Sequence, residues 1–138
     1  MDLARGRVLV AGAAEGRVMR LAEPLSFWGG VDPQTSVLTD PRGPASGAAI
    51  AGRVLVLAQT RGSSSSSAVL LELLRGGRAP AALVLAEVDA ILIIGVLVAR
   101  EMGWPTIPVL ELPLANHVAL DDGRAVSITD DGAIVAAG

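Results

Sequence analysis

Two segments in the middle of the chain each join a short aliphatic strand to a longer helix, and this pattern limits the possible folds more than any other feature. Strands are predicted at Arg53–Ala58 and Ala81–Ala86, because compact aliphatic runs of this length are typical of strands buried on both faces. Thr106–Leu110 is predicted to be a third central strand. Strands that alternate with helices imply an α/β layer.

The first helix is predicted to begin near Ser65, with Ser65 or Ser66 as its cap, and to stop at Gly76–Gly77. Its apolar residues repeat at helical spacing: Val69, Leu70, Leu73 and Leu74.

The second helix is predicted from a cap at Asp89 to Met102, where Gly103 and Pro105 end it. Periodicity alone would also allow Ile91–Val98 to be a strand, but the length between the breaking residues favours a helix.

The flanking segments read as β-structure and loops. A hairpin is predicted between Arg7–Ala11 and Val18–Ala22, around a Gly-Ala-Ala-Glu-Gly turn. Pro and Gly residues make Glu23–Asp40 a long loop, and the chain stays irregular over Arg42–Gly52. The tail is predicted to be a meander of short strands separated by Asp-Asp-Gly turns, at Val118–Leu120, Ala125–Thr129 and Ala133–Ala136.

Length and composition indicate one domain, residues 1–138, with an aliphatic core. Apolar residues make up 51% of the chain and the mean hydropathy is +0.56, so we expect an almost wholly aliphatic interior together with apolar surface that a partner covers. The longest apolar run, Ala90–Ala99, is about half the roughly 20 residues of a membrane helix. Without a secretory signal pattern or any cysteine, a cytoplasmic protein that contacts no membrane is expected.

The composition also argues against two classes of function. With no cysteine and one histidine, His117, the chain is not expected to hold a metal or an iron–sulfur cluster by itself. A net charge of −3, scattered arginines and few aromatic rings argue against nucleic acid as a partner. His117 is interpreted as structural or solvated, and the Asp-Asp-Gly pairs as turn residues.

The candidate site is the run Arg61-Gly-Ser-Ser-Ser-Ser-Ser67 between the first strand and the first helix. Amides at a helix start lack backbone partners and lie at the positive end of the helix dipole, so such a turn can hold a carboxylate or phosphate. A serine run is more often a flexible linker, but linkers do not usually separate a buried strand from a helix. Gly62 to Ser65 are therefore the candidate functional residues.

Several motifs in a fixed order resemble the swivel domain of the aconitase X family. They are Pro24-Leu-Ser-Phe-Trp-Gly-Gly-Val-Asp-Pro33, Gly52-Arg-Val-Leu-Val-Leu57, the serine run, Gly77-Arg-Ala-Pro80 and the long apolar helix, and the resemblance covers about Gly6 to Leu120. It implies a swivelling β/β/α domain with a central β-sheet or partly closed barrel, two main helices and flanking β-hairpins.

The resemblance further implies one part of a dehydratase, a hydro-lyase. A large subunit would carry the iron–sulfur cluster and most of the pocket for a small carboxylate substrate, and this domain would close over it. The serine that follows the glycine of the motif, Ser63, corresponds to the general base. Arg61, Gly62, Ser64, Ser65 and Ser26 are the expected substrate-binding residues.

The run of five serines is similar to the bacterial type, which acts on cis-3-hydroxy-L-proline; 5-phosphomevalonate, the archaeal substrate, is the alternative. One departure matters: aconitases have a carboxylate-binding arginine two residues after the base, and that position is Ser65 here. A carrier domain, or an anion-binding module without catalysis, remains the alternative from another class because such folds recur with unrelated roles.

Overall fold

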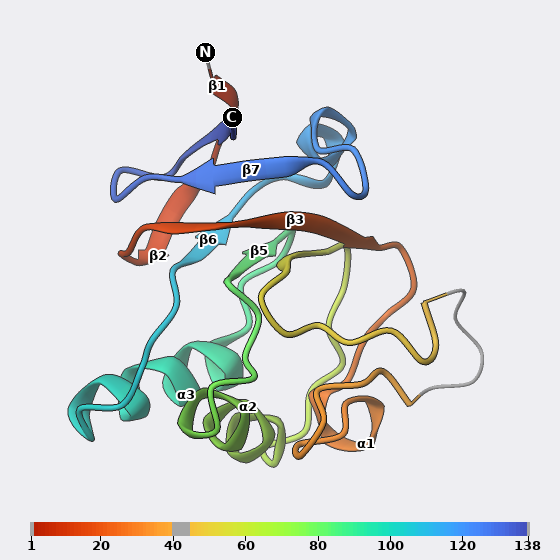
Figure 1. Ribbon diagram of the computed structural model, residues 1–138, viewed down its shortest axis with the longest axis vertical. Helices are drawn as coiled ribbons and strands as arrows, with labels where there is room; N and C mark the ends of the chain where they lie inside the picture. Colours follow the sequence, from red (N-terminus) through yellow and green to blue (C-terminus); the bar gives the residue numbers. More distant parts are fainter. Residues whose placement is uncertain (1, 40–44, 138) are drawn as a thin grey trace.

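A single eight-stranded sheet organises the molecule. The computed structural model describes residues 2–39 and 45–137, and the strand order in the sheet is β1-β8-β7-β3-β4-β5-β6-β2. The helices cover one face of the part of the sheet that holds β4, β5 and β6, and the part that holds β7 and β8 folds over the opposite face, as the bottom and top of Figure 1 show. No ladder joins the two end strands within these residues, so the sheet is not closed. The predicted α/β class is confirmed.

The central strands β4 (Val54–Leu57) and β5 (Ala82–Leu85) lie parallel to each other and are buried at every position. Side chains alternate between the two faces of a strand, so Leu55 and Leu57 enter the core under the helices. Val54 and Val56 enter a second core on the other face. Two cores explain why the sequence shows continuous apolar runs here instead of alternation.

Both predicted helices are present. Helix α2 (Ser66–Arg75) and helix α3 (Ala90–Glu101) pack against each other and against the same face of the sheet. In α3 the backbone comes very close to α2, because a Cβ at Gly95 would lie 3.2 Å from the Ser67 carbonyl oxygen. Both helices follow strands of the parallel layer, so both begin at the same edge of the sheet.

The predicted N-terminal hairpin is wrong. Strand β2 (Arg7–Val10) pairs with β6, whereas β3 (Ala14–Leu21) pairs antiparallel with β7 through its first half and parallel with β4 through its second. Met19 and Val18 enter the cores on opposite faces of the sheet, and this two-sided burial places β3 inside the sheet, between β7 and β4, instead of beside β2. Strand β1 (Asp2–Arg5) precedes β2 and pairs with β8.

The third central strand and the tail differ in part from the prediction. Strand β6 is Val109–Glu111, later than expected, after Pro108, which has no amide hydrogen to donate. The predicted strand at Val118–Leu120 is wrong: a 3₁₀ helix, η1 (Leu114–Ala119), follows Pro113 there. Strands β7 (Ala125–Ile128) and β8 (Ala133–Ala136) form the predicted antiparallel pair.

The expected loop over Glu23–Asp40 contains one short helical segment, α1 (Phe27–Gly30), in which Trp28 and Gly29 depart from helical geometry. Part of the irregular stretch expected over Arg42–Gly52, and Asp40 itself, lie outside the described residues. Among the helices that the structure describes, none has the length and hydropathy that a membrane span requires.

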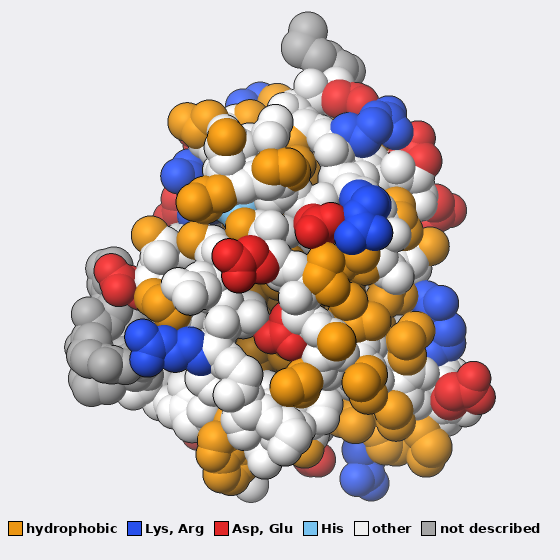
Figure 2. All heavy atoms as spheres, turned by 180° about the vertical axis from the view of Figure 1, so that it is seen from behind, with side chains coloured by type: hydrophobic (Ala, Val, Ile, Leu, Met, Phe, Trp, Pro, Cys, Tyr) orange, Lys and Arg blue, Asp and Glu red, His pale blue; other side chains and the backbone are white. Residues whose placement is uncertain are grey.

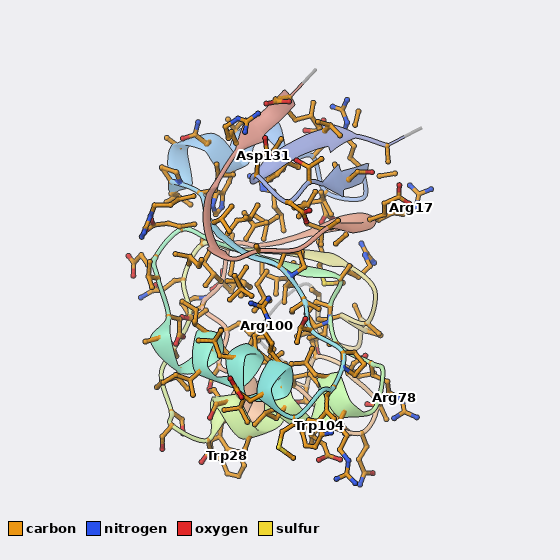
Figure 3. The ribbon with its side chains drawn as sticks, turned by 90° about the vertical axis from the view of Figure 1, so that its left-hand side faces the viewer. Arg17, Trp28, Arg78, Arg100, Trp104 and Asp131 are labelled. Carbon is orange, nitrogen blue, oxygen red and sulfur yellow. The ribbon has the colours of Figure 1, made fainter. Side chains whose placement is uncertain are left out.

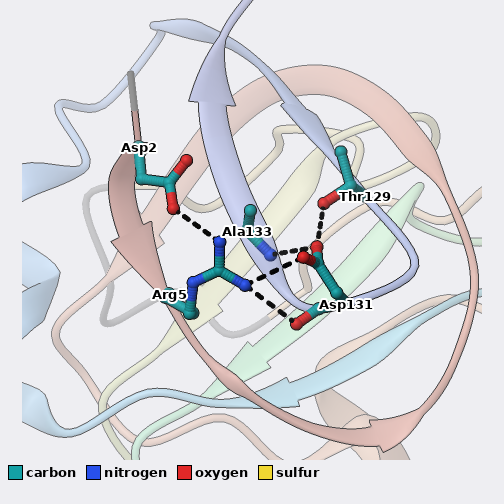
Figure 4. A network of polar contacts seen from close by, with 5 residues as sticks. All are labelled: Asp2, Arg5, Thr129, Asp131 and Ala133. Atoms are coloured by element: carbon teal, nitrogen blue, oxygen red, sulfur yellow. Dashed lines mark hydrogen bonds and ion pairs between the residues drawn. The ribbon is translucent and has the colours of Figure 1, made fainter.

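Ion pairs fasten the N-terminal strand to the turn between β7 and β8. Arg5 lies 2.8 Å from a carboxylate oxygen of Asp2 and 3.0 Å from one of Asp131 (Figure 4). Asp131 also accepts hydrogen bonds from the Thr129 hydroxyl and the Ala133 amide. These bonds, first the one from Thr129 and then the one from Arg5, lower the pKa of Asp131 from 3.8 to about 2.

This shift predicts a specific loss of stability in acid. Because the pKa of Asp131 is lowered in the folded state, its contribution is complete above about pH 4 and is lost as the pH falls toward 2. Asp131→Asn should therefore flatten the decline in unfolding midpoint over this range, measured by urea denaturation at several pH values. Asp130→Asn is the matched control and should follow the original protein. Parallel curves for Asp131→Asn and the original protein would contradict the assignment.

Candidate functional site

The serine turn, residues 61–65, connects the carboxyl end of β4 to the start of α2. Backbone hydrogen bonds to the segment around Leu25 fix its approach. The Leu25 amide donates to the Gln59 carbonyl at 3.1 Å, and the Arg61 amide donates to the Leu25 carbonyl at 2.9 Å. The start of the turn is therefore held against the segment around Leu25 by backbone hydrogen bonds, and the turn is not a free linker.

Ser63 lies where the turn becomes a helix. Its side chain is half-buried, and its Oγ accepts a hydrogen bond from the Ser65 amide at 3.2 Å. Its carbonyl accepts from the Ser66 amide at 2.9 Å. Within the described residues the amides of Gly62, Ser63 and Ser64 make no hydrogen bond to the protein. An anionic oxygen at Ser63 would thus lie beside a donated N–H at the positive end of α2.

The remaining serines have distinct surroundings. Ser65 occupies the N-cap position of α2, as predicted, but its hydroxyl makes no capping bond. Ser64 is exposed, and its carbonyl accepts from the Ser67 hydroxyl at 2.9 Å. Ser66 is buried, and its Oγ lies 3.4 Å from the Trp28 amide. The sequence run therefore has one hydroxyl, that of Ser63, that is both half-buried and bonded to a helix-start amide.

The Ser26-Phe27-Trp28 segment reaches the start of α2, as the bond between Trp28 and Ser66 shows. Phe27 is buried in the core and anchors the segment, while Trp28 remains 59% exposed. Ser26 donates to the Trp28 carbonyl at 2.9 Å, so its hydroxyl is already engaged locally. Figure 3 shows Trp28 at the edge of the helical layer, away from Trp104.

Gly62 is not required by the conformation of the turn. It does not have a positive φ, and a Cβ built at this position meets no atom within 4 Å. A glycine whose absent side chain would occupy open space leaves room for a molecule outside the chain.

Arg61 is exposed and borders a pocket of about 540 Å³, whereas Gly62 and the serines from Ser63 to Ser67 do not line it. The pocket wall carries two further arginines, Arg20 and Arg53, that were not among the predicted site residues. Arg20 lies in β3, and Arg53 precedes β4 within the motif Gly52-Arg-Val-Leu-Val-Leu57. The pocket's other lining residues are Met19, Leu21, Ala22, Glu23, Pro24, Leu25, Leu38, Ala45, Ser46, Ala48 and Asp122.

Asp89 connects the serine turn to the second helix. As predicted, it caps α3: its Oδ1 accepts from the amides of Ile91 and Leu92 at 3.0 and 3.3 Å. Its other oxygen accepts from the Thr60 hydroxyl at 2.7 Å, immediately before Arg61. The sequence predicted the cap but gave no signal for the bond to Thr60, because that bond depends on two β–α loops lying side by side.

His117 lies in the interior, where its Nε2 is 2.9 Å from the Leu112 carbonyl oxygen. Burial lowers its pKa, which favours the neutral ring. Among residues 2–39 and 45–137, no group of three or more His, Asp or Glu side chains is placed to hold a metal ion.

These features define the class of the protein: a β/β/α domain that presents a half-buried serine hydroxyl and helix-start amides at one edge of its sheet. A family model described as the aconitase X swivel domain matches residues 3–137. The chain belongs to the aconitase X swivel domain family.

Named relatives fall into two groups. The chain is 48% identical to the cis-3-hydroxy-L-proline dehydratase of Pseudomonas aeruginosa over 86% of its own length, but spans 22% of that protein. It is 36% identical to the phosphomevalonate dehydratase small subunit of Thermococcus kodakarensis, covering 93% of this chain and 97% of that one. The chain likewise spans only 21% of a second cis-3-hydroxy-L-proline dehydratase, from Hypocrea jecorina.

A solved structure supports the same fold. The crystal structure of Thermococcus kodakaraensis aconitase X in its holo-form superposes with a TM-score of 0.84 at 32% identity, over 97% of both chains.

The link through Asp89 yields a stability prediction. Asp89→Ala removes the cap of α3 and leaves the Thr60 hydroxyl without its acceptor, so the free energy of unfolding should fall by about 1–2 kcal/mol in urea denaturation. Asp130→Ala, which changes an exposed aspartate in a turn, should cost less than about 0.5 kcal/mol. Equal costs for the two variants would contradict the role given to Asp89.

Proposed function

We propose that this chain, as one domain over residues 1–138, is the small swivel part of an aconitase X-type dehydratase that acts together with a large subunit. The observation that carries the proposal is the Ser63 hydroxyl, half-buried at the start of α2 and bonded to the Ser65 amide. Relatives of this family are named as dehydratases or their small subunits, which supports the reaction class.

In this proposal Ser63 is the general base. Dehydration removes a proton from the carbon beside a carboxylate, and hydroxide leaves from the neighbouring carbon and departs as water. Ser63 Oγ, as an alkoxide, takes the carbon-bound proton and becomes a neutral hydroxyl. The departing hydroxide takes up a proton from solvent and becomes water, and loss of the Ser63 proton to solvent restores the alkoxide. A serine alkoxide is too costly in water, so it requires the Ser65 amide, the helix dipole and the exclusion of solvent by the partner.

The residues of this chain do not fit an iron–sulfur cluster, because the sequence contains no cysteine. The family resemblance therefore assigns the cluster to the large subunit, where an iron would supply the Lewis acid for the departing hydroxyl. This chain contributes the base and part of the anion site. Arg61, Gly62, Ser64, Ser65 and Ser26 are the proposed substrate contacts. Gly62 and Ser64 would contribute their open amides, and Arg61 its guanidinium.

The proposed substrate is cis-3-hydroxy-L-proline, which would yield 1-pyrroline-2-carboxylate. The 48% identity to the Pseudomonas aeruginosa relative favours it. The second candidate is the dehydration of 5-phosphomevalonate to trans-anhydromevalonate 5-phosphate, favoured by relatives that match this chain over nearly their whole length. Assay of the assembled enzyme on both compounds distinguishes them.

Ser63→Ala should lower turnover by about 10²–10⁴-fold, because the base is removed while the fold remains. The test mixes the variant with the large subunit and measures both turnover and co-elution of the subunits, which should be unchanged. Ser127→Ala on β7 removes a hydroxyl of the same size far from the turn and serves as the control. Turnover of Ser63→Ala within about threefold of the original enzyme would refute the assignment and leave a non-catalytic anion-binding or carrier role.

Gly62→Ala separates catalysis from folding. The free energy of unfolding of the isolated chain should change by less than about 0.5 kcal/mol, because the added methyl meets nothing in the chain. Turnover of the assembled enzyme should fall about tenfold or more, because the methyl enters space that we assign to substrate or partner. Full activity together with full stability would show that this space is not used.

A further inference from the structure

The pocket of about 540 Å³ beside β3 has a wall that combines arginines with aliphatic side chains. Arg20, Arg53 and Arg61 line it from three separate segments: the end of β3, the residue before β4, and the serine turn. On the face drawn in Figure 2, by contrast, the arginines lie apart from one another, as is usual for a solvated surface. The fold therefore brings three positive side chains from different segments to one cavity.

The three positive charges of the pocket are not paired with carboxylates. Among the described residues the ion pairs involve Arg5 and Arg7 and none of the pocket arginines. Glu23 and Asp122 also line the pocket, but one oxygen of Asp122 accepts instead from a backbone amide of β3 at 2.8 Å. Two carboxylates against three arginines leave the wall positive, and an anion in the pocket would reduce the repulsion among the guanidinium groups.

Much of the hydrogen-bonding capacity of these guanidinium groups is unused. Arg61 is exposed and makes no side-chain hydrogen bond or ion pair within the described residues. Arg20 makes one side-chain bond, at 3.4 Å, to a backbone carbonyl. Arg53 is held in place, because its Nε and one Nη each donate at 3.2 Å to backbone carbonyls of β3, and its other Nη stays available. Guanidinium groups with free donors match the oxygens of carboxylates and phosphates.

The rest of the pocket wall is mainly aliphatic. Met19, Leu25 and Leu38 are core residues that line it, and the half-buried Leu21 and Pro24 lie beside them. An anion attached to an aliphatic chain would cover this surface and gain about 25 cal/mol per Å² of apolar area removed from water, whereas an inorganic anion would not. The pocket volume lies within the range of about 300–1,000 Å³ that is typical of small-molecule sites.

We infer that this pocket is a binding site for a small amphipathic oxyanion, a carboxylate or phosphate carried on a short aliphatic chain. The site is separate from the proposed catalytic serine, because Gly62 and the serines from Ser63 to Ser67 do not line the pocket. The inference goes beyond the proposed function and does not depend on it, since the ligand would bind this chain without the large subunit.

The test titrates the full chain with hexyl phosphate and with hexanoate and follows the backbone amide signals by NMR. Both probes should saturate, with the largest shifts at residues 19–25 and 45–48 and small shifts at residues 63–67, and the tighter probe identifies the oxyanion. Hexanol lacks the charge and inorganic phosphate lacks the aliphatic chain, so each should bind at least about tenfold more weakly than hexyl phosphate.

Substitutions of the arginines test the wall directly. Arg20→Gln should raise the dissociation constant of the tighter probe about tenfold, because it removes one charge and its donors. Arg53→Gln should have a similar effect, and circular dichroism verifies its fold because Arg53 also bonds β3. Arg78→Gln is the matched control, since Arg78 is exposed and does not line the pocket, and it should change the constant less than about twofold.

Four results would overturn the inference. They are no binding of either probe up to about 10 mM, equal affinity for inorganic phosphate and hexyl phosphate, an unchanged dissociation constant in Arg20→Gln, and shifts confined to the serine turn. The last result would place the ligand in the proposed catalytic site. None of them changes the turnover expected of Ser63→Ala, so this inference and the proposed function fail separately.

Discussion

Burial of β4 and β5 on both faces is the constraint on which the rest of the structure depends. Leu55 and Leu57 pack under the helices, and Val54 and Val56 pack against the opposite β layer. This two-sided burial keeps the strands in the middle of the sheet, and the helices that connect them let them run parallel. Parallel strands bring the starts of α2 and α3 to one edge. The serine turn owes its position to that edge, and Asp89 then fastens it there through Thr60.

The backbone of the serine turn is held firmly, but several of its polar groups and the space beside Gly62 have no partner within the described residues. Its backbone is paired with Leu25, while the Ser63 hydroxyl meets a single amide and Gly62 faces open space. Serine in water is far too weak a base to remove a carbon-bound proton. Ser63 could therefore act as a base only in a site from which solvent is excluded. In the proposed function another polypeptide supplies this enclosure, because a serine base requires a site from which solvent is excluded.

Sequence reasoning predicted the parts of the fold whose signals are local. The strands β4 and β5, both helices and the Asp89 cap follow from apolar periodicity, glycine and proline stops, and capping chemistry. The N-terminal hairpin was wrong because β2 and β3 pair with strands distant in sequence, and short apolar runs do not encode their partners. For the same reason no sequence signal indicated the bond between Thr60 and Asp89, or the pocket that Arg20 and Arg53 line together.

The central claim is that Ser63 faces a reaction centre held by another polypeptide. A crystal structure of the assembled enzyme with a bound substrate analogue tests it most directly. The account predicts Ser63 Oγ about 3–3.5 Å from the carbon that loses its proton, with the analogue between the serine turn and the partner's iron. A complex in which the serine turn is open to solvent, or in which the analogue binds without reaching it, would contradict the account.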